Sequence, residues 1–196
     1  MSEPLMIHPL ARGLIFDLDG TLADTLPIHY RAWHETFASF GVTCPQSFLD
    51  ELTGLPTAET VRRFNQRFGH ALDPQGFARA KEELVRGRLM QSTPIMPVVA
   101  VLQQARGVWP IALATGGIMS NVKVVLAAVG LTGAFDAIVT ADDAVPHKPA
   151  PGIFLEAARR IAVPPTQCQV FEDGEAGLQG ARAAGMIVTD VRPFLR

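Results

Sequence analysis

Residues 14–22 read Leu-Ile-Phe-Asp-Leu-Asp-Gly-Thr-Leu, and this stretch decides the fold. Its first three residues form a short apolar run, which is typical of a strand buried on both faces. Two carboxylates, Asp17 and Asp19, follow that run at once. The first strand of the chain is therefore predicted to end in an acidic loop, and the rest of the sequence shows what surrounds it.

Four more short apolar runs repeat the pattern, with an amphipathic helical pattern before each. The runs lie at residues 111–114, 137–140, 169–171 and 186–188, and the helical patterns at 98–106, 120–129, 152–161 and 178–184. Strands that alternate with helices favour right-handed crossovers and a parallel sheet. We therefore expect an α/β fold, namely a Rossmann-like, doubly wound parallel sheet.

One interval interrupts this alternation. Between residues 27 and 91 the sequence has helical patterns at 28–40, 58–68 and 75–90 but no convincing strand. We expect an inserted all-helical domain at residues 25–94, while residues 1–24 and 95–196 form the α/β core. Linkers near residues 22–26 and 91–97 should join the two parts.

Composition narrows the class of protein. The 196 residues have a formal net charge of -2 and contain no run of Lys and Arg, so the charge pattern of a nucleic-acid-binding protein is missing. No apolar stretch approaches the length that crosses a bilayer, and the two cysteines form no CxxC pair. We expect a cytoplasmic monomer that binds neither nucleic acid nor a membrane.

The loops at the carboxyl ends of the strands gather on one edge of such a sheet. Four carboxylates should meet there, and they are Asp17, Asp19, Glu172 and Asp173. Two like charges about 4 Å apart repel by roughly 4 kcal/mol at an effective dielectric constant near 20. A hard divalent cation can offset this repulsion, and an oxygen-only ligand set without His or Cys favours Mg²⁺ over zinc.

A carboxylate beside such an ion, with a second carboxylate two residues later, suits phosphoryl transfer, because it supplies an oxygen nucleophile and a proton shuttle. Thr115 and the amides of Gly116 and Gly117 could bind phosphate oxygens where a helix begins. Lys148, just beyond the third strand, could offset charge on the transferring group. The expected partner is a small phosphorylated metabolite.

The same residues resemble the four motifs of the haloacid dehalogenase superfamily. Residues 17–22 are similar to its first motif, Thr115 to the second, Lys148 in His-Lys-Pro-Ala-Pro to the third, and Val-Phe-Glu-Asp at 170–173 to the fourth. The helical insertion resembles the cap of β-phosphoglucomutase-like members. Residues 29–33 and 164–168 are most similar to the fructose-1-phosphate and 6-phosphogluconate phosphatase group.

The resemblance implies a role for each acidic residue. Asp17 would attack phosphorus and bind Mg²⁺, and Asp19 would act as general acid and base and offer its backbone carbonyl to the metal. Asp173 would be a further ligand, with Glu172 either beside it or an additional ligand. This implies a Mg²⁺-dependent phosphoric monoester hydrolase that acts on a small sugar phosphate or sugar-acid phosphate through an aspartyl phosphate.

Two residues of the insertion match functional positions in relatives. His29 matches a position at the cap interface, and Lys81 matches a cap lysine that reaches the active site in mutases. For both, an ordinary position on a solvated helix surface is the alternative. Gly174 stands where many relatives have a serine, so phosphate contacts there would depend on backbone amides.

Two rival functions follow from the same residues. The first is a phosphoglucomutase-like isomerase, but Thr53 and Thr57 stand where mutases carry a lysine and an arginine that hold the second phosphate. The second is a phospho-aspartate signalling or binding module, which also places acidic residues, a Thr and a Lys at strand ends. Such modules lack the helical insertion and the acid-base position of Asp19.

Overall fold

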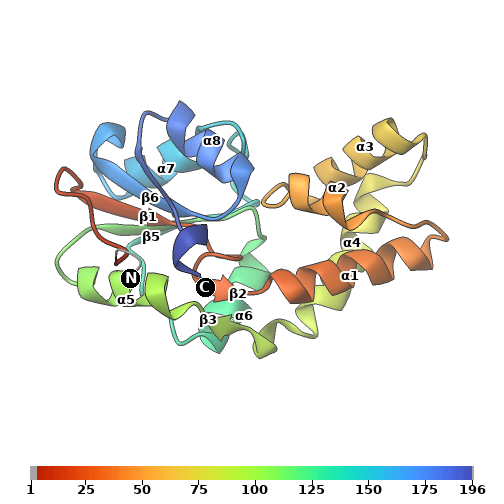
Figure 1. Cartoon of the computed structure of the whole chain (residues 1–196), viewed down its shortest axis with the longest axis horizontal. Helices are drawn as coiled ribbons and strands as arrows, with labels where there is room; N and C mark the ends of the chain where they lie inside the picture. The colour runs from red at the N-terminus through yellow and green to blue at the C-terminus, as the bar shows by residue number, and fades with distance from the viewer. Residues whose placement is uncertain (1–3, 196) are drawn as a thin grey trace.

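A five-stranded parallel sheet organises the larger part of the chain in the computed structural model, which describes residues 4–195 (Figure 1). The strand order is β5-β4-β1-β6-β7, with β1 in the centre. The strands are β1 Gly13–Phe16, β4 Ile111–Ala114, β5 Ala137–Val139, β6 Cys168–Glu172 and β7 Ile187–Asp190. All four neighbouring pairs are parallel. The five strands predicted from the sequence are confirmed.

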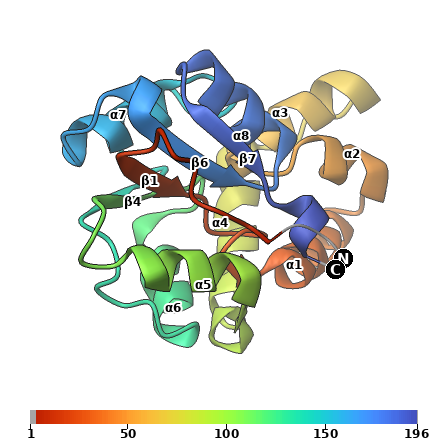
Figure 2. The same cartoon turned by 60° about the vertical axis from the view of Figure 1, so that its left-hand side comes forward.

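Helices cover both faces of this sheet (Figure 2). One face is covered by α5 Met96–Ala105 and α6 Met119–Ala128, and the other by α7 Gly152–Arg160 and α8 Glu175–Ala183. The side chains of β1 alternate between them: Leu14 and Phe16 pack in one hydrophobic cluster and Ile15 in the other. Because β1 is buried on both faces, it has no polar residue before Asp17, which explains its continuous apolar run.

A second group of helices lies beyond the carboxyl ends of the strands (Figure 1). It consists of α1 Leu26–Ser39, α2 Gln46–Glu51, α3 Thr57–Phe68 and α4 Pro74–Arg86, which we call the helical unit. The unit has its own hydrophobic cluster, in which the ring centroids of Phe37 and Phe64 lie 4.6 Å apart. The all-helical character predicted for the insertion is confirmed.

Two details of the helical unit differ from the prediction. The short helix α2 was not predicted, because six residues are too few to show a helical period. The helix expected at 75–90 ends at Arg86, and a separate 3-10 turn follows at Leu89–Gln91. Its start agrees with the sequence, since Asp73 caps it by accepting from the amides of Gln75 and Gly76.

The chain leaves and re-enters the sheet-bearing part through a small antiparallel ribbon. Strand β2, Ala23–Asp24, pairs with β3, Thr93–Pro94, so the two expected linkers lie side by side. Both strands lie outside residues 27–91, where no strand was expected, and they were not predicted, because two-residue strands carry no detectable alternation. Two further 3-10 turns lie at Pro165–Gln167 and Arg192–Phe194.

Within residues 4–195, no helix is both long enough and apolar enough to cross a membrane.

Candidate active site

Lys148 lies between two buried carboxylates at the carboxyl edge of the sheet. Its Nζ donates to Oδ1 of Asp17 at 2.5 Å and to Oε2 of Glu172 at 2.7 Å. Asp17 is the first residue after β1, and Glu172 is the last residue of β6, the neighbouring strand. The parallel register of β1 and β6 therefore places the two carboxylates side by side, with the lysine 1% exposed between them.

Asp173 completes a cluster of three carboxylates. One ligand oxygen each from Asp17, Glu172 and Asp173 lies within 4.8 Å of the others. Oδ1 of Asp173 accepts from the hydroxyl of Thr21 at 2.7 Å. When all three carboxyls are ionised, their negative charge exceeds the one positive charge of Lys148 by two, and all the donor atoms are oxygens. This donor set fits a hard divalent cation such as Mg²⁺.

Gly20 allows this close packing. It has a φ of +86°, in the left-handed region that favours glycine, and a Cβ added there would lie 2.3 Å from Oδ2 of Asp173. A side chain at position 20 would therefore displace the Asp173 carboxylate from the cluster.

Burial and mutual repulsion disfavour the charged forms of these carboxyls. Burial, followed by the charge of Asp17, raises the pKa of Glu172 to about 8 and that of Asp173 to about 7. Burial also raises the pKa of Asp17, although Lys148 opposes this shift. Burial alone would lower the pKa of Lys148, but the charges of Asp17 and Glu172 raise it. The lysine is therefore charged. Its one positive charge does not compensate the negative charge of the three carboxylates, so further positive charge would stabilise their ionised forms.

The side-chain contacts of Asp19 are with residues at the start of the helical unit rather than with the three-carboxylate cluster. Its Oδ1 accepts from the hydroxyl of Thr25 at 2.6 Å and lies 3.4 Å from Nε2 of His29. Nδ1 of that histidine lies 3.2 Å from Nζ of Lys81. Burial alone would raise the pKa of Asp19, but the hydrogen bond and charge of His29, with help from Thr25 and Lys81, lower it to about 2.

His29 and Lys81 therefore lie at the site rather than on a solvated helix surface. The side chain of Lys81 is only 4% exposed, and its Nζ lies 4.9 Å from the ring centroid of Trp33. The structure connects Asp19 to α4 through these two side chains. The sequence left open a solvated helix surface for both residues, because a helical pattern does not show which polar residue faces a second domain.

The candidate phosphate-binding residues follow β4. Thr115 is 1% exposed, and its Oγ1 accepts from the amide of Gly117 at 3.1 Å. That amide is therefore engaged within the loop, so the predicted use of Gly117 as an outward donor requires this contact to open. Gly116 lies against the helical unit. A Cβ added to it would lie only 2.7 Å from the carbonyl oxygen of Gly54.

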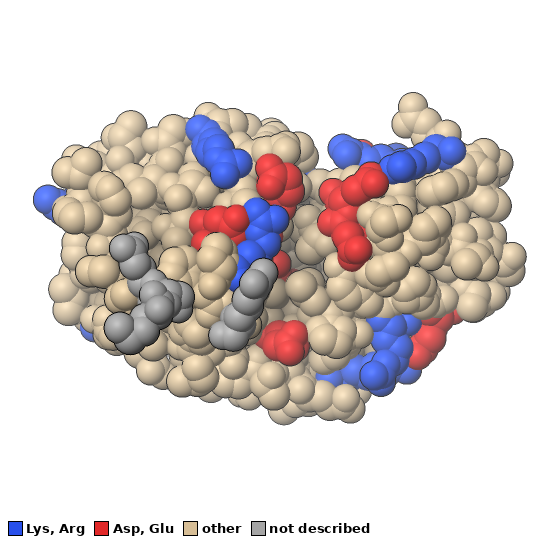
Figure 3. Space-filling model, in the orientation of Figure 1, with Lys and Arg blue, Asp and Glu red and all other residues tan. Residues whose placement is uncertain are grey.

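The helical unit is closed over the sheet edge. Besides the contact of Gly54 with Gly116, the carbonyl oxygen of Thr53 lies 3.3 Å from the Cβ position of Gly174. A cavity of about 250 Å³ remains between the two parts, lined by residues from both, including Asp17, Asp19, Thr115, Thr53 and Lys81. Figure 3 shows a hollow between the two lobes of the surface, with acidic side chains on both sides of it.

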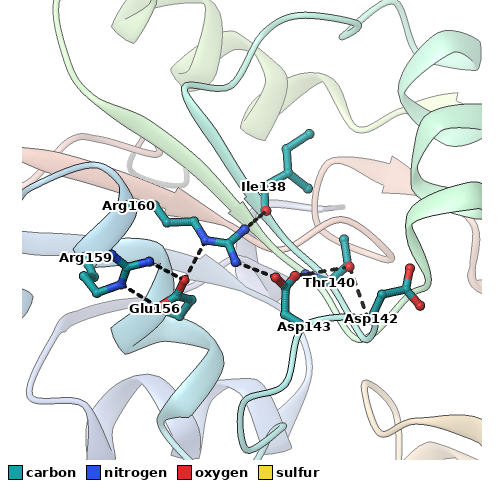
Figure 4. A network of polar contacts seen from close by, with 7 residues as sticks. All are labelled: Ile138, Thr140, Asp142, Asp143, Glu156, Arg159 and Arg160. Carbon is teal, nitrogen blue, oxygen red and sulfur yellow. Dashed lines mark hydrogen bonds and ion pairs between the residues drawn. The ribbon is translucent and has the colours of Figure 1, made fainter.

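A network of polar contacts braces the loop that leads from β5 to Lys148 (Figure 4). Asp143 accepts from the amide of Thr140 at 2.7 Å, and Asp142 accepts from that of Met119 at 2.8 Å. Arg160 on α7 donates to the carbonyl of Ile138 at 2.7 Å and to Asp143. These contacts connect the loop to α6 and α7, and so hold the backbone that carries the buried lysine.

Two cavity residues were missed from the sequence. Glu82 on α4 accepts a hydrogen bond from Asn121 on α6 at 2.5 Å, across the boundary between the helical unit and the sheet-bearing part. No motif contains either residue, and only the folded chain brings them together.

Comparisons with known proteins find similarity over most of the chain. A family model described as haloacid dehalogenase-like hydrolase matches residues 11–185. Fructose-1-phosphate phosphatase YqaB of Escherichia coli (strain K12) is 44% identical over 183 residues, which are 92% of this chain and 96% of that protein.

Two crystal structures have the same architecture. CbbY from Rhodobacter sphaeroides in complex with phosphate superimposes with a TM-score of 0.79 and 28% identity, covering 91% of this chain and 84% of CbbY. β-Phosphoglucomutase from Clostridium difficile superimposes with a TM-score of 0.81 and 25% identity, covering 92% and 84%.

The carboxylate cluster predicts how stability depends on pH. The folded chain holds protons on Glu172 and Asp173 up to about pH 8 and 7, whereas their ordinary pKa values are 4.5 and 3.8. Between these limits the folded state binds more protons than the unfolded state, so the free energy of unfolding contributed by the cluster falls as pH rises. Mg²⁺ binds the deprotonated carboxylates, so its stabilisation should grow over the same range.

Thermal unfolding in EDTA and in Mg²⁺ tests this expectation. At about pH 8, Mg²⁺ should raise Tm by about 5 °C or more, and at about pH 5.5 by clearly less. Asp173→Asn should unfold at a higher temperature than the wild type in EDTA at the higher pH, because one repulsive charge is gone, and should lose the Mg²⁺ shift. A Mg²⁺ shift equal at both pH values, or retained in Asp173→Asn, would contradict the assignment.

Proposed function

The chain belongs to the haloacid dehalogenase-like hydrolases, and on that premise we propose that it is a Mg²⁺-dependent phosphatase that hydrolyses a small sugar phosphate through an aspartyl phosphate on Asp17. The observation that carries the proposal is the contact of Asp17 with Lys148 beside two more buried carboxylates, at the wall of the cavity between the helical unit and the sheet edge. The sequence similarity to a fructose-1-phosphate phosphatase supports the sugar phosphate as substrate class.

Asp17, Asp173 and the backbone carbonyl of Asp19 would hold the magnesium ion. Bound there, the ion would offset the negative charge of the phosphoryl group and of the surrounding carboxylates. Both oxygens of Glu172 already have partners, because Oε2 accepts from Lys148 and Oε1 from the amide of Gly174 at 2.9 Å. These contacts favour a role for Glu172 in positioning Lys148. A role as a direct ligand of the metal is less favoured.

The first chemical step forms the bond between an oxygen of Asp17 and phosphorus and breaks the bond between phosphorus and the sugar oxygen. Lys148 offsets charge on the phosphoryl group as this happens, and Asp19 delivers a proton to the departing oxygen. Asp19 has a low pKa while His29 contacts it, so it must gain its proton as the substrate displaces that contact. Thr115 and the amide of Gly116 bind phosphate oxygens.

The second step releases the phosphate. A water molecule attacks phosphorus, Asp19 accepts its proton, and the bond to Asp17 breaks, which regenerates the carboxylate. Asp19 is a carboxylate at this point, because it has just given its proton to the sugar oxygen, and it can therefore accept a proton from the water.

We further propose that residues 25–94 act as a cap that opens and closes over a core of residues 1–24 and 95–196. The ribbon of β2 and β3 joins the two parts and is the natural hinge. In the closed arrangement the cap excludes bulk water from the cavity and brings His29 and Lys81 to Asp19. We also expect a cytoplasmic monomer whose partner is a small phosphorylated metabolite.

The two rival functions fit the cavity less well. A mutase must hold a doubly phosphorylated intermediate while it turns around, but Thr53 and Thr57 carry no charge. Lys81 is engaged by Glu82 and Thr57, at 3.5 and 3.4 Å from its Nζ. A phospho-aspartate signalling module needs no cavity of about 250 Å³ between its aspartate and a helical insertion.

The nucleophile assignment predicts the effect of Asp17→Asn. Phosphate release from p-nitrophenyl phosphate should fall by about 10³-fold or more, because an amide is a poor nucleophile. The variant should remain folded, since one repulsive carboxylate is gone. Asp50→Asn, the same change at an exposed position of α2, should keep normal activity. Near-native release by folded Asp17→Asn would disprove the nucleophile assignment.

The cap residues predict the fate of the phosphoryl group. Each missing charge-assisted contact to a second phosphate forfeits roughly 1.5 to 3 kcal/mol, so two uncharged threonines should weaken its retention by about 10²-fold or more. A sugar monophosphate should therefore release inorganic phosphate, whereas β-glucose 1-phosphate with a bisphosphate primer should give little glucose 6-phosphate. Isomerisation faster than phosphate release in a coupled assay would favour the mutase.

A further inference from the structure

Polar side-chain contacts join the helical unit to the sheet-bearing part at two places among residues 4–195. At the start of α1, Thr25 and His29 contact Asp19. At the other place, Nδ2 of Asn121 on α6 donates to Oε2 of Glu82 on α4 at 2.5 Å. This second contact includes none of the proposed catalytic residues. It can therefore hold the two parts together whether or not a substrate engages Asp19.

Helix α4 extends across the boundary between the two parts. Phe77, near its start, packs in the hydrophobic cluster of the helical unit. Val85, near its end, belongs to the same cluster of the sheet-bearing part as Val122 of α6. Glu82 lies three residues before Val85, and Asn121 directly precedes Val122, so the hydrogen bond lies beside this apolar contact and in the cavity wall. Rotation of the helical unit about the ribbon of β2 and β3 would turn α4 at this contact and separate the pair.

The hydrogen bond satisfies only one end of the asparagine amide. A hydrogen bond to a carboxylate is stronger than one between neutral groups. Asn121 is only 6% exposed, however, and its Oδ1 has no hydrogen-bond partner within residues 4–195. Turning the amide around would place Oδ1 against the Glu82 carboxylate, which has no proton to donate. The closed arrangement thus combines a favourable contact with an unsatisfied buried acceptor that water would reach on opening, so the contact is reversible.

The same carboxylate also contacts the residues that approach Asp19. Oε1 of Glu82 accepts from the hydroxyl of Thr57 at 3.2 Å and lies 3.5 Å from Nζ of Lys81. That Nζ lies 3.2 Å from Nδ1 of His29, whose Nε2 lies 3.4 Å from Oδ1 of Asp19. A continuous series of polar contacts therefore leads from α6 through α4 and α1 to the proposed acid-base residue.

We propose that Glu82 and Asn121 are positioning residues that form a latch, a hydrogen bond that holds the helical unit closed over the cavity and breaks when the unit opens. The latch raises the fraction of molecules that are ready to bind a substrate productively. It acts through the position of the helical unit and of Lys81, without touching the reacting atoms. The inference rests on the phosphatase function and the opening and closing proposed above, and adds the contact that controls this movement.

A reversed pair of side chains tests the latch. Asn121→Asp replaces the donor by a second carboxylate, so the pair should repel and the helical unit should open. Adding Glu82→Gln supplies an amide donor from the other side, which restores one hydrogen bond to a carboxylate and the net charge of the wild-type pair. Glu82→Gln alone keeps an acceptor and should stay close to the wild type. Glu83→Gln, the same change at the next residue of α4, which is exposed, is the control.

The distance between spin labels on the two parts measures closure directly. Helices α3 and α8 lie in the upper half of Figures 1 and 2 and belong to different parts. Gln66→Cys on α3 and Gln179→Cys on α8 place labels at exposed positions, whereas both native cysteines are buried. With Mg²⁺ and no phosphate ester, pulsed EPR should show the ratio of closed to open molecules falling by about 10-fold or more in Asn121→Asp. The double variant with Glu82→Gln should return toward the wild type.

Kinetics with p-nitrophenyl phosphate give the second measurement. Because apparent affinity is reduced by the fraction of competent molecules, KM in Asn121→Asp should rise by about the factor by which the closed fraction falls. The bound enzyme is closed in both proteins, so kcat should change by less than about 2-fold. Adding Glu82→Gln should lower KM again, which neither general damage to the fold nor direct repulsion of the substrate by Asn121→Asp would produce.

The two measurements separate the latch from the proposed function. If the wild type releases no phosphate from p-nitrophenyl phosphate, the proposed function fails, while the label distances still test the latch. Unchanged distances in folded Asn121→Asp, or a raised KM that the added Glu82→Gln does not lower, would overturn the inference. A loss of kcat at unchanged KM would do the same. If Asn121→Asp does not fold, Glu82→Ala, which removes the acceptor altogether, decides by the same two measurements.

Discussion

Three buried carboxylates around a single lysine are the constraint on which the rest of the site depends. The parallel pairing of β1 with β6 forces Asp17 and Glu172 together, and Asp173 follows directly. Lys148 compensates only part of their charge, so the edge of the sheet is built to receive positive charge. The surrounding features serve this requirement: Gly20 makes room for Asp173, and the network around Asp143 and Arg160 holds the loop of the lysine.

The helical unit adds the second half of the site. It brings His29 and Lys81 to Asp19, so the proposed acid-base residue is connected to the helical unit, whereas Asp17, the proposed nucleophile, is connected to the core through Lys148. The opening and closing proposed for residues 25–94 would therefore change the surroundings of Asp19 most directly. The proposed closure would also join Glu82 to Asn121 across the cavity, and would thereby couple substrate binding to the assembly of the proposed catalytic groups.

Much of this arrangement could be predicted from the sequence, because strands buried on both faces leave uninterrupted apolar runs and end in polar residues. This pattern identified β1 and placed Asp17, Asp173 and Lys148 at one edge. Elements without a period were out of reach, as with the two-residue strands of the ribbon and the six residues of α2. The pairing of Glu82 with Asn121 was also hidden, since it depends on how two separately packed parts meet.

The central claim is that phosphoryl transfer passes through a covalent bond to Asp17. Asp19→Asn should trap that state with p-nitrophenyl phosphate, because p-nitrophenolate leaves without needing a proton whereas the attacking water still needs a base. After a rapid acid quench, peptide mass spectrometry should find one phosphoryl group on the peptide that contains Asp17, together with a burst of p-nitrophenolate. A burst with no phosphorylated peptide, or with the phosphoryl group on another residue, would contradict the account.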